Sequence, residues 1–267
     1  MPKNRSLLVR LGKCVGPMFN RIIARGSLVP NTPVLDKEPF PWAKMLEERA
    51  PVIIAEFNAI LMDRDSVPAL RELLPDHKRI APDHRRKSLF LYGYGIRVPE
   101  NCERVPRTAE IVAKVPGLCS ALFSILEAGG EIPSQNGVTK GMLNSHFGLS
   151  VPTNTGKCWI EIGGERHQWQ PGRLVIFDDT YKHSVHNQTK EIRGILFLQV
   201  ERPVFGTARI AQRLFLTDVR YSAFVKDAQA GINERNRRRR NATERDGSAA
   251  RRTDWSVLTL RNNRGTP

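Results

Sequence analysis

The chain has 267 residues, of which 42 are Lys or Arg and 27 are Asp or Glu, so its formal net charge at pH 7 is +15. A hydrophobic content of 40% is too high for a disordered chain and suits one main domain with appendages. No stretch approaches the roughly 18 consecutive apolar residues of a membrane-spanning helix. The cysteines include no CxxC pair, which excludes a zinc ribbon and a disulfide scaffold and favours a reducing, cytoplasmic compartment. They are Cys14, Cys102, Cys119 and Cys158.

The excess positive charge is concentrated at the two ends. Residues 1–30 hold six Lys or Arg and no acid, with apolar residues between them at roughly helical spacing. This pattern predicts a basic amphipathic arm that lies either on an acidic membrane surface or on the protein body. Residues 231–267 hold ten Arg against four acids and show little apolar periodicity. We expect a disordered Arg-rich tail, which could bind the phosphates of nucleic acid or anionic lipid or could simply be solvated.

Behind the basic arm, residues 31–117 are predicted to form a mixed segment that is mainly helical. Apolar residues recur at helical spacing over Trp42–Met62, with an interruption at Pro51, and again over Thr108–Val115. The stretch Ser88–Val98 has the character of a strand.

From Leu118 onward, short apolar runs alternate with turn residues at the eight-to-twelve-residue rhythm of an all-β sandwich or barrel. The pair Gly163–Gly164 predicts a two-residue hairpin. We therefore predict a mainly β protein with a jelly-roll (double-stranded β-helix) core over residues 118–206 and a C-terminal helix over residues 207–230. The expected strands are 118–126, 141–152, 158–162, 173–177, 183–186 and 193–200.

Histidines and one arginine in this β region are candidates for a site that binds a metal ion and an anionic ligand. A strand through His183, a turn at 187–189 and a return strand through Arg193 could bring an imidazole and a guanidinium to one mouth of the barrel. A neutral imidazole binds Fe(II), and a guanidinium holds a carboxylate through two parallel hydrogen bonds. The residues alone leave another interpretation open, in which His183 is a hydrogen-bonded histidine at a strand end and Arg193 forms a surface ion pair.

Three sequence motifs carry a resemblance to a known family. They are HFGLSVP from His146 to Pro152, WxPGxLVIFDDTYxH ending at His183, and RGILFLQVERP from Arg193 to Pro203. In order and spacing they resemble the aspartyl/asparaginyl β-hydroxylases, which are Fe(II)- and 2-oxoglutarate-dependent dioxygenases on a jelly-roll core. The upstream NTPVLD segment from Asn31 and the closing VERP most resemble the bacterial branch that hydroxylates the acyl chains of lipid A.

The resemblance implies roles for individual residues. His183 would be the distal iron ligand, and Arg193 would bind the distal carboxylate of 2-oxoglutarate. Ser124 and His146 match positions that contact the same cosubstrate.

Two positions depart from the family's pattern. The proximal iron-binding histidine falls on Gln135, whose neutral amide is a weaker metal ligand than imidazole. An arginine that helps hold the cosubstrate in peptide-hydroxylating members falls on Asn144. Iron affinity should therefore be reduced unless 2-oxoglutarate or a nearby histidine, His186 or His167, compensates. Asp178 and Asp179, just before His183, are interpreted as turn formers and hydrogen-bond partners rather than as ligands.

The resemblance implies a cytoplasmic Fe(II)/2-oxoglutarate-dependent hydroxylase that uses O₂ to hydroxylate an unactivated C–H bond. The substrate would be a lipid A-type acyl chain or an aspartyl or asparaginyl side chain of an acidic protein. The basic ends add two further partners to test, an anionic inner membrane surface and nucleic acid. The alternative is a catalytically impaired jelly roll that has kept a binding role, because Gln135 stands at an iron-ligand position.

Overall fold

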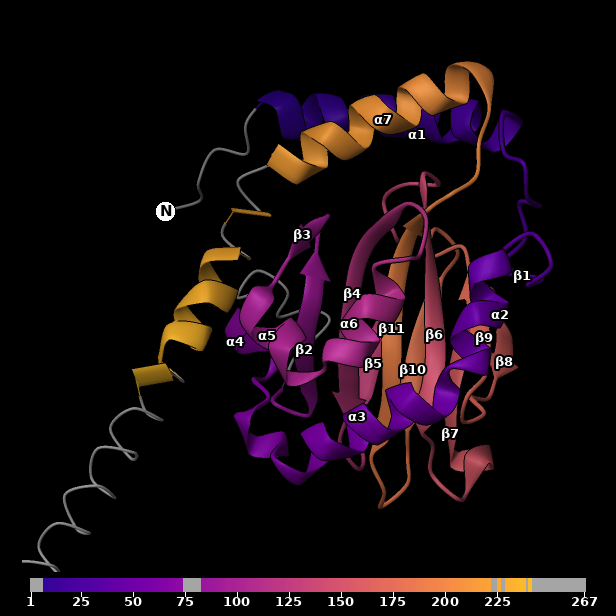
Figure 1. Cartoon of the computed structure of the whole chain (residues 1–267). Helices are drawn as coiled ribbons and strands as arrows, with labels where there is room; N and C mark the ends of the chain where they lie inside the picture. Colours follow the sequence, from indigo (N-terminus) through magenta and orange to yellow (C-terminus); the bar gives the residue numbers. More distant parts are fainter. Residues whose placement is uncertain (1–6, 74–82, 222–224, 227–228, 239, 242–267) are drawn as a thin grey trace, which may run out of the picture.

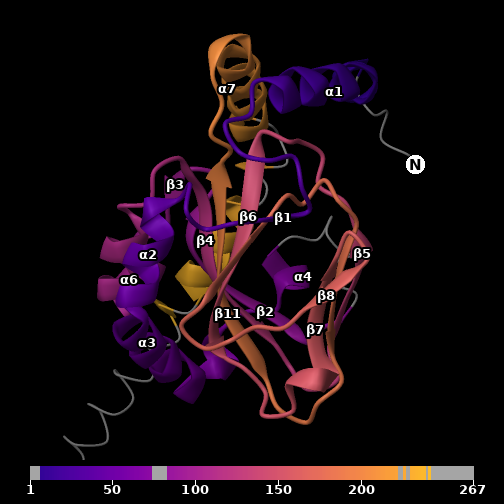
Figure 2. The ribbon, with the colours of Figure 1, turned by 90° about the vertical axis from the view of Figure 1, so that its right-hand side faces the viewer.

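The structure is a computed structural model of the chain and describes residues 7–73, 83–221, 225–226, 229–238 and 240–241 (Figure 1). Its core consists of two antiparallel sheets. The larger has the strand order β1-β9-β6-β11-β4-β2-β3, and the smaller has the order β5-β10-β7-β8. In Figure 2 the two sheets are seen partly from the edge and enclose the interior of a flattened barrel. The predicted jelly-roll core is confirmed.

The larger sheet contains β1 (Val34–Leu35), β2 (Arg86–Gly93), β3 (Ile96–Arg97), β4 (Leu118–Leu126), β6 (Met142–Ser150), β9 (Leu174–Phe177) and β11 (Arg193–Glu201). The smaller contains β5 (Glu131–Gln135), β7 (Cys158–Ile162), β8 (Glu165–His167) and β10 (His183–Asn187). The helices are α1 (Leu7–Arg25), α2 (Pro41–Glu48), α3 (Ala50–Met62), α4 (Leu70–Leu73), α5 (Pro99–Arg104), α6 (Pro106–Val112) and α7 (Gly206–Tyr221), with short 3₁₀ turns at Arg64–Ser66 and Thr155–Lys157.

The predicted strands match β4, β6, β7, β9, β10 and β11 closely. The hairpin at Gly163–Gly164 is also confirmed, because Ile162 pairs with Glu165 and both glycines have positive φ, 61° and 95°. Such φ values are the ones that a tight hairpin turn requires. The sequence pattern missed β5, and it did not assign β2 to the core, although β2 pairs with β4 inside the larger sheet.

Helices α2, α3 and α6 cover the outer face of the larger sheet (Figures 1 and 2). The Phe57 ring of α3 packs edge-on against the Phe123 ring of β4, with ring centroids 5.2 Å apart. A side chain at Gly194 of β11 would collide with Phe57, so glycine allows this close approach. Pro51, which interrupts the predicted helix, lies in the first turn of α3, where its missing N–H is not needed. The helices therefore bury the outer face of the central strands of the larger sheet.

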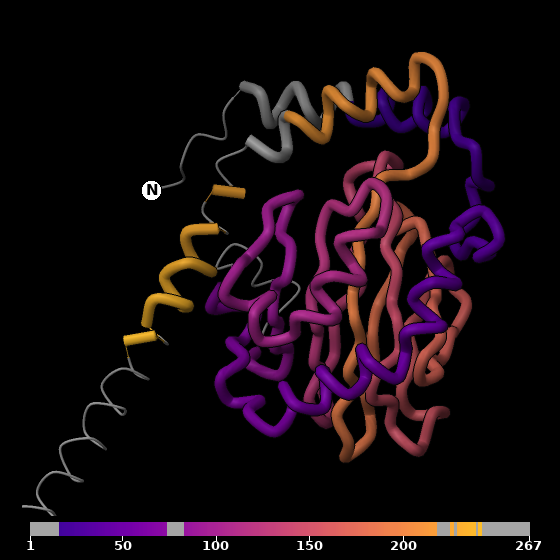
Figure 3. The backbone as a smooth tube through the Cα atoms, viewed as in Figure 1, coloured from indigo at the N-terminus to yellow at the C-terminus, as the bar shows by residue number. Residues whose placement is uncertain are grey.

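Helices α1 and α7 lie side by side across one end of the barrel (Figures 1 and 3), and we call this pair the cap. Ile23 of α1 is fully buried, and a Cβ on Gly26 would lie 2.4 Å from Ala208 of α7. Asn20 accepts a hydrogen bond from the backbone N–H of Lys140, in the loop before β6. The C-terminal half of the predicted amphipathic arm therefore packs on the protein body.

The C-terminal segment differs from the predicted boundary of the flexible tail at residue 231. Residues 229–238 are helical, and Ile232 is buried in a cluster with Leu73 and Phe90. Glu234 supports this helix through ion pairs with Arg237 and Arg238, three and four residues later. A lone apolar residue and one acid are too weak a pattern to predict this packing. The rest of the predicted tail, residues 242–267, lies outside the described residues.

In the described ranges, no helix combines the length and the hydropathy that crossing a bilayer requires. The cysteines with described side chains, Cys102, Cys119 and Cys158, are all free thiols.

Candidate functional site

A cavity of about 230 Å³ opens between the two sheets. Four of the six residues singled out in the sequence line it: Gln135, Asn144, His146 and His183. Ser124 and Arg193 do not line the cavity. They belong to strands β4 and β11, which contribute Leu122 and Phe197 to its wall. Because side chains alternate along a strand, Ser124 and Arg193 point to the same inner face, deeper in the barrel.

His183 and Gln135 form a pair. They are register partners on the adjacent strands β10 and β5, so their side chains project from the same face. The Nδ1 atom of His183 lies 3.0 Å from the carbonyl oxygen of Tyr181. A carbonyl can only accept, so Nδ1 carries the proton and Nε2 keeps its lone pair. Burial chiefly lowers the pKa of His183 below 6.5, and the imidazole is therefore neutral at neutral pH.

Arg193 is completely buried, and its guanidinium has no hydrogen-bond acceptor among the described residues. The guanidinium stacks on the Trp169 ring, whose centroid lies 4.9 Å from the guanidinium carbon. Burial lowers the pKa of Arg193 to about 9, which leaves the group charged at neutral pH. A buried cation with all three nitrogens unsatisfied is costly, and an anion bound beside it would remove the cost. This observation speaks against the surface ion pair that the sequence left open.

His146 lies between the cavity and Arg193. The indole N–H of Trp169 donates to its Nδ1 atom at 3.4 Å, so its Nε2 atom carries the proton and can donate to an anion. Burial first, and then the charges of Arg193 and His183, hold the pKa of His146 well below 6.5. His146 is therefore a neutral hydrogen-bond donor at the cavity wall.

Asn144 lines the cavity, but both ends of its amide are already hydrogen-bonded. It donates to Asp179 Oδ2 at 3.0 Å and accepts from Gln199 Nε2 at 3.1 Å. Asp179 also lines the cavity, and its carboxylate packs on Gly137, where a Cβ would lie 2.0 Å from Asp179 Oδ1. The glycine two residues after Gln135 thus leaves room for a carboxylate contributed by another loop.

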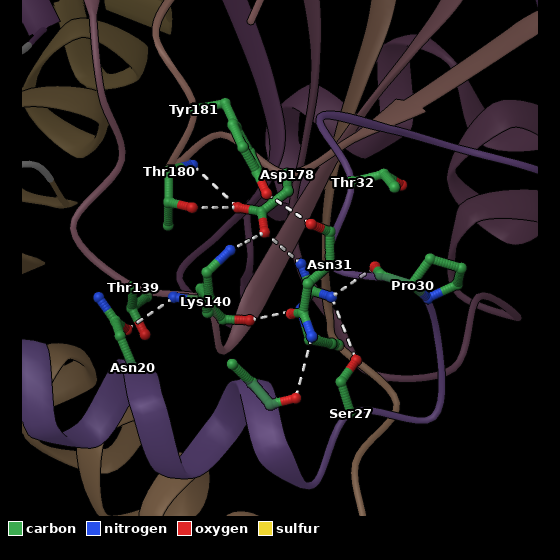
Figure 4. Close-up of polar contacts among 12 residues, drawn as sticks. Asn20, Ser27, Pro30, Asn31, Thr32, Thr139, Lys140, Asp178, Thr180 and Tyr181 are labelled. Carbon is green, nitrogen blue, oxygen red and sulfur yellow. Dashed lines mark hydrogen bonds and ion pairs between the residues drawn. The ribbon is translucent and has the colours of Figure 1, made fainter.

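The two aspartates before His183 have different environments. Asp178 accepts hydrogen bonds from the backbone and hydroxyl of Thr180 and from Lys140 Nζ at 2.7 Å (Figure 4). It also accepts one from Arg202 Nη2 at 2.5 Å. Arg202 in turn donates to the carbonyls of Lys140 and Pro30. Asp178 is therefore a structural partner, as its interpretation as a turn former indicates. Asp179 instead reaches the cavity.

The Asp179 carboxyl should make stability depend on pH. Burial first, and Asp178 second, raise the pKa of Asp179 from 3.8 to about 7. The folded chain therefore holds this proton more tightly than the unfolded chain, and the resulting stability is present below about pH 4 and lost as the pH rises to about 7. We expect Asp179→Asn to improve the free energy of unfolding, relative to the wild type, more near pH 7 than near pH 4. Urea unfolding at both ends would measure this, with the exposed Asp65→Asn as control; parallel pH profiles for Asp179→Asn and the wild type would contradict it.

The sequence pattern missed Arg86. This residue lines the cavity from β2 and sits opposite Leu126 of β4, which on its other side is opposite Arg193. Its charge lowers the pKa of both His146 and His183. The predicted strand began at Ser88, two residues too late. The alternation of Arg86 with the cavity-lining Phe90 was the signal that could have found it.

The histidines considered as substitute ligands do not line the cavity. His186 contacts Ser184 at 2.9 Å and stacks on the Trp159 ring on the other face of β10. His167 lies on β8, near Glu165. In the described part of the chain, no three His, Cys, Asp or Glu side chains form a group that could hold a metal ion.

Comparison with known proteins decides the family. The chain matches the aspartyl/asparaginyl β-hydroxylase family over residues 47–203, more than half of its length. The chain belongs to this family. The family match includes the whole of both sheets apart from β1, and all six residues singled out in the sequence. This aspartyl/asparaginyl β-hydroxylase family member therefore belongs to a family of hydroxylases and has a jelly-roll core.

The relatives in the family act on different substrates. The chain is 35% identical over 197 residues to the ornithine lipid ester-linked acyl 2-hydroxylase of Rhizobium tropici, and the alignment covers 74% of this chain and 70% of that protein. It is 28% identical over 118 residues to human aspartyl/asparaginyl β-hydroxylase, and this alignment covers 42% of the present chain and 15% of the human protein. A prolyl-4-hydroxylase structure from Pseudomonas putida aligns over 58% of this chain and 88% of that chain, with 15% identity and a TM-score of 0.38.

Proposed function

We propose that the chain is an Fe(II)- and 2-oxoglutarate-dependent hydroxylase that acts on an acyl chain of a membrane lipid. The main support for 2-oxoglutarate as the cosubstrate is the buried Arg193, whose guanidinium has no hydrogen-bond acceptor among the described residues. A carboxylate of 2-oxoglutarate would satisfy it through two parallel hydrogen bonds. The Nε2–H of His146 supplies a further donor nearby, and Arg86 adds a second positive charge at the cavity wall.

The residues at the mouth of this pocket fit iron. The neutral His183 would supply Nε2 as a ligand, and the neighbouring amide of Gln135 would supply an oxygen. Bound Fe(II) would supply oxygen activation at this point. The chain's own part is to hold the dicarboxylate with Arg193, to fix the His183 tautomer through the Tyr181 carbonyl, and to shield the reaction from water between the two sheets.

The choice of an acyl chain rests on two supports. The lipid-hydroxylating relative from Rhizobium tropici covers most of this chain, and it is more similar than the human aspartyl/asparaginyl hydroxylase. The cavity wall includes the apolar side chains of Leu70, Phe90, Leu122 and Ile132, which suit a hydrocarbon. A lipid A-type glycolipid and an ornithine lipid share this acyl chemistry, and they are separate arms of a substrate assay.

Uncoupled turnover of 2-oxoglutarate to succinate tests the proposal without the true substrate. We expect the purified chain, supplied with Fe(II), to produce succinate, and His183→Ala to reduce the rate at least tenfold, because only the weak amide ligand of Gln135 remains. Gln135→His should tighten iron binding and raise the rate at limiting iron. The matched control is His84→Ala, which alters an exposed histidine outside the barrel.

Two outcomes would overturn the proposal. Succinate production that survives His183→Ala unchanged would remove the iron site from this cavity. A silent wild type that Gln135→His switches on would favour the alternative, a jelly roll that has lost its iron chemistry and kept a binding role.

A further inference from the structure

The cap at the end of the barrel exposes apolar side chains together with positive charge. Among the described residues, nine large hydrophobic side chains are exposed, and five of these belong to the cap and its flanking residues. They are Met18, Leu28, Phe205, Ile210 and Leu214. On α7, Ile210 and Leu214 are spaced four residues apart and therefore lie on one helical face, each more than 60% exposed.

Arginines accompany this apolar surface. Arg209 and Arg213 precede Ile210 and Leu214 on α7, and Arg21 and Arg25 are exposed on α1. Residues 1–30 contain no acidic residue. Exposed apolar groups of this size with arginines beside them match the headgroup layer of a bilayer that contains anionic lipid.

A groove leads from the cap toward the cavity of the candidate site. It has a volume of about 190 Å³ and runs between α7, through Leu216 and Thr217, and the ends of the strands, through Leu118 and Met142. Tyr94 and Gln199 line both this groove and the site cavity, so these two side chains are the partition between them. Arg213 also lines the groove, where it can hold a lipid phosphate while the acyl chain enters.

We propose that the cap is a membrane-docking surface and that the groove guides a lipid acyl chain from the bilayer past Tyr94 and Gln199 to the candidate site. The second part rests on the proposed function, because it names the route by which that substrate arrives. The docking part does not depend on iron or on turnover. The partner is an anionic bilayer, and the apolar stripe of α7 inserts while the arginines bind the phosphates.

Vesicle co-sedimentation tests the docking surface in the full chain. We expect the wild type to bind vesicles of phosphatidylglycerol and phosphatidylcholine, and to bind pure phosphatidylcholine far less. The double variant Ile210→Glu/Leu214→Glu should lose at least roughly tenfold in binding, because it places charge where the helix inserts. The control is Met62→Glu, which changes a side chain that is 92% exposed at the end of α3, outside the cap.

A second pair of variants separates charge from insertion. Arg25→Glu/Arg209→Glu should weaken binding to the anionic vesicles strongly at low salt, whereas Arg107→Glu on α6 should not. The docking surface would be overturned if both cap variants bound anionic vesicles as well as the wild type does. It would also be overturned if the cap variants lost binding to a short RNA but kept their binding to vesicles. Succinate production should be equal in the wild type and in Ile210→Glu/Leu214→Glu, so failure of the docking surface and failure of the proposed function are read separately.

Photo-crosslinking tests the groove. Phosphatidylglycerol with a diazirine on its acyl chain should label residues of the groove, among them Leu118, Met142 and Leu216. Thr217→Trp should reduce this labelling by filling the groove, and Thr207→Trp, on an exposed part of the same helix, should leave it unchanged. Labelling confined to the outer surface of the cap, or unaffected by Thr217→Trp, would overturn the route.

Discussion

Replacing Arg193 by methionine should stabilise the ligand-free protein and strongly weaken its binding of 2-oxoglutarate. The guanidinium is fully buried, with three nitrogens that lack a hydrogen-bond acceptor among the described residues. Its stacking on Trp169 offsets only part of the cost of burying the charge. Methionine has a similar length and no charge, so we expect a gain of about 1–3 kcal/mol in the free energy of unfolding. Denaturant unfolding without ligand measures this gain.

The same substitution should weaken 2-oxoglutarate binding by roughly 30-fold to several thousand-fold. Removing one member of a buried charge pair costs about 2–5 kcal/mol, and each 1.4 kcal/mol is a tenfold change in affinity. Thermal shift with and without 2-oxoglutarate provides the measurement, because a bound ligand raises the apparent stability.

Arg202→Met is the matched control for Arg193→Met. Arg202 is also a buried arginine, but it is hydrogen-bonded to Asp178 and to backbone carbonyls. Its replacement should therefore destabilise the protein, opposite in sign to Arg193→Met. If Arg193→Met also destabilises the protein, or still binds 2-oxoglutarate with wild-type affinity, then Arg193 is not an anion-binding residue.

Asp178→Asn should be the most destabilising single polar substitution near the site. The Asp178 and Arg202 side chains are both 0% exposed. Without the carboxylate charge, Arg202 remains buried and unneutralised, which costs about 3–5 kcal/mol. In a domain of this size, such a loss corresponds to a fall in Tm of about 6–20 °C. Differential scanning calorimetry measures it.

An exposed ion pair calibrates this result. Asp65 pairs with Lys87 at 3.1 Å, and the Asp65 side chain is 95% exposed. Asp65→Asn should cost less than about 1 kcal/mol, because an exposed pair competes with solvent. A shift for Asp178→Asn as small as that for Asp65→Asn would mean that the Asp178–Arg202 contact does not stabilise the loop between β9 and β10, and hence the positions of Asp179 and His183.

Local patterns predicted much of the core. Strands β4 and β11 are rich in apolar residues because most of their side chains are buried, and Gly163–Gly164 marks a hairpin because its backbone needs positive φ. The motif order around His146, His183 and Arg193 indicated the family, which the match over residues 47–203 established. The turn between His183 and Arg193 was also expected.

Other features could not be read from local patterns. Strands β10 and β11 do not pair with each other but belong to opposite sheets, so His183 and Arg193 face one interior from two sides. Gln135 lies on β5, whose irregularly spaced polar residues and Pro133 gave no strand signal. Arg86 is charged and therefore has the appearance of a surface residue, although it lines the cavity.

The sequence by itself predicted the jelly-roll class and the basic ends, because these follow from residue type, periodicity and spacing, and its resemblance to the family implied which residues could hold iron and a dicarboxylate. Only the tertiary structure decided which of those groups have partners. In the structure, Arg193 has no hydrogen-bond acceptor among the described residues, whereas Asn144 is hydrogen-bonded to Asp179 and Gln199. Helix α1 lies beside α7, which is nearly two hundred residues away in the chain. These features depend on contacts between distant segments, whose energies no local pattern contains.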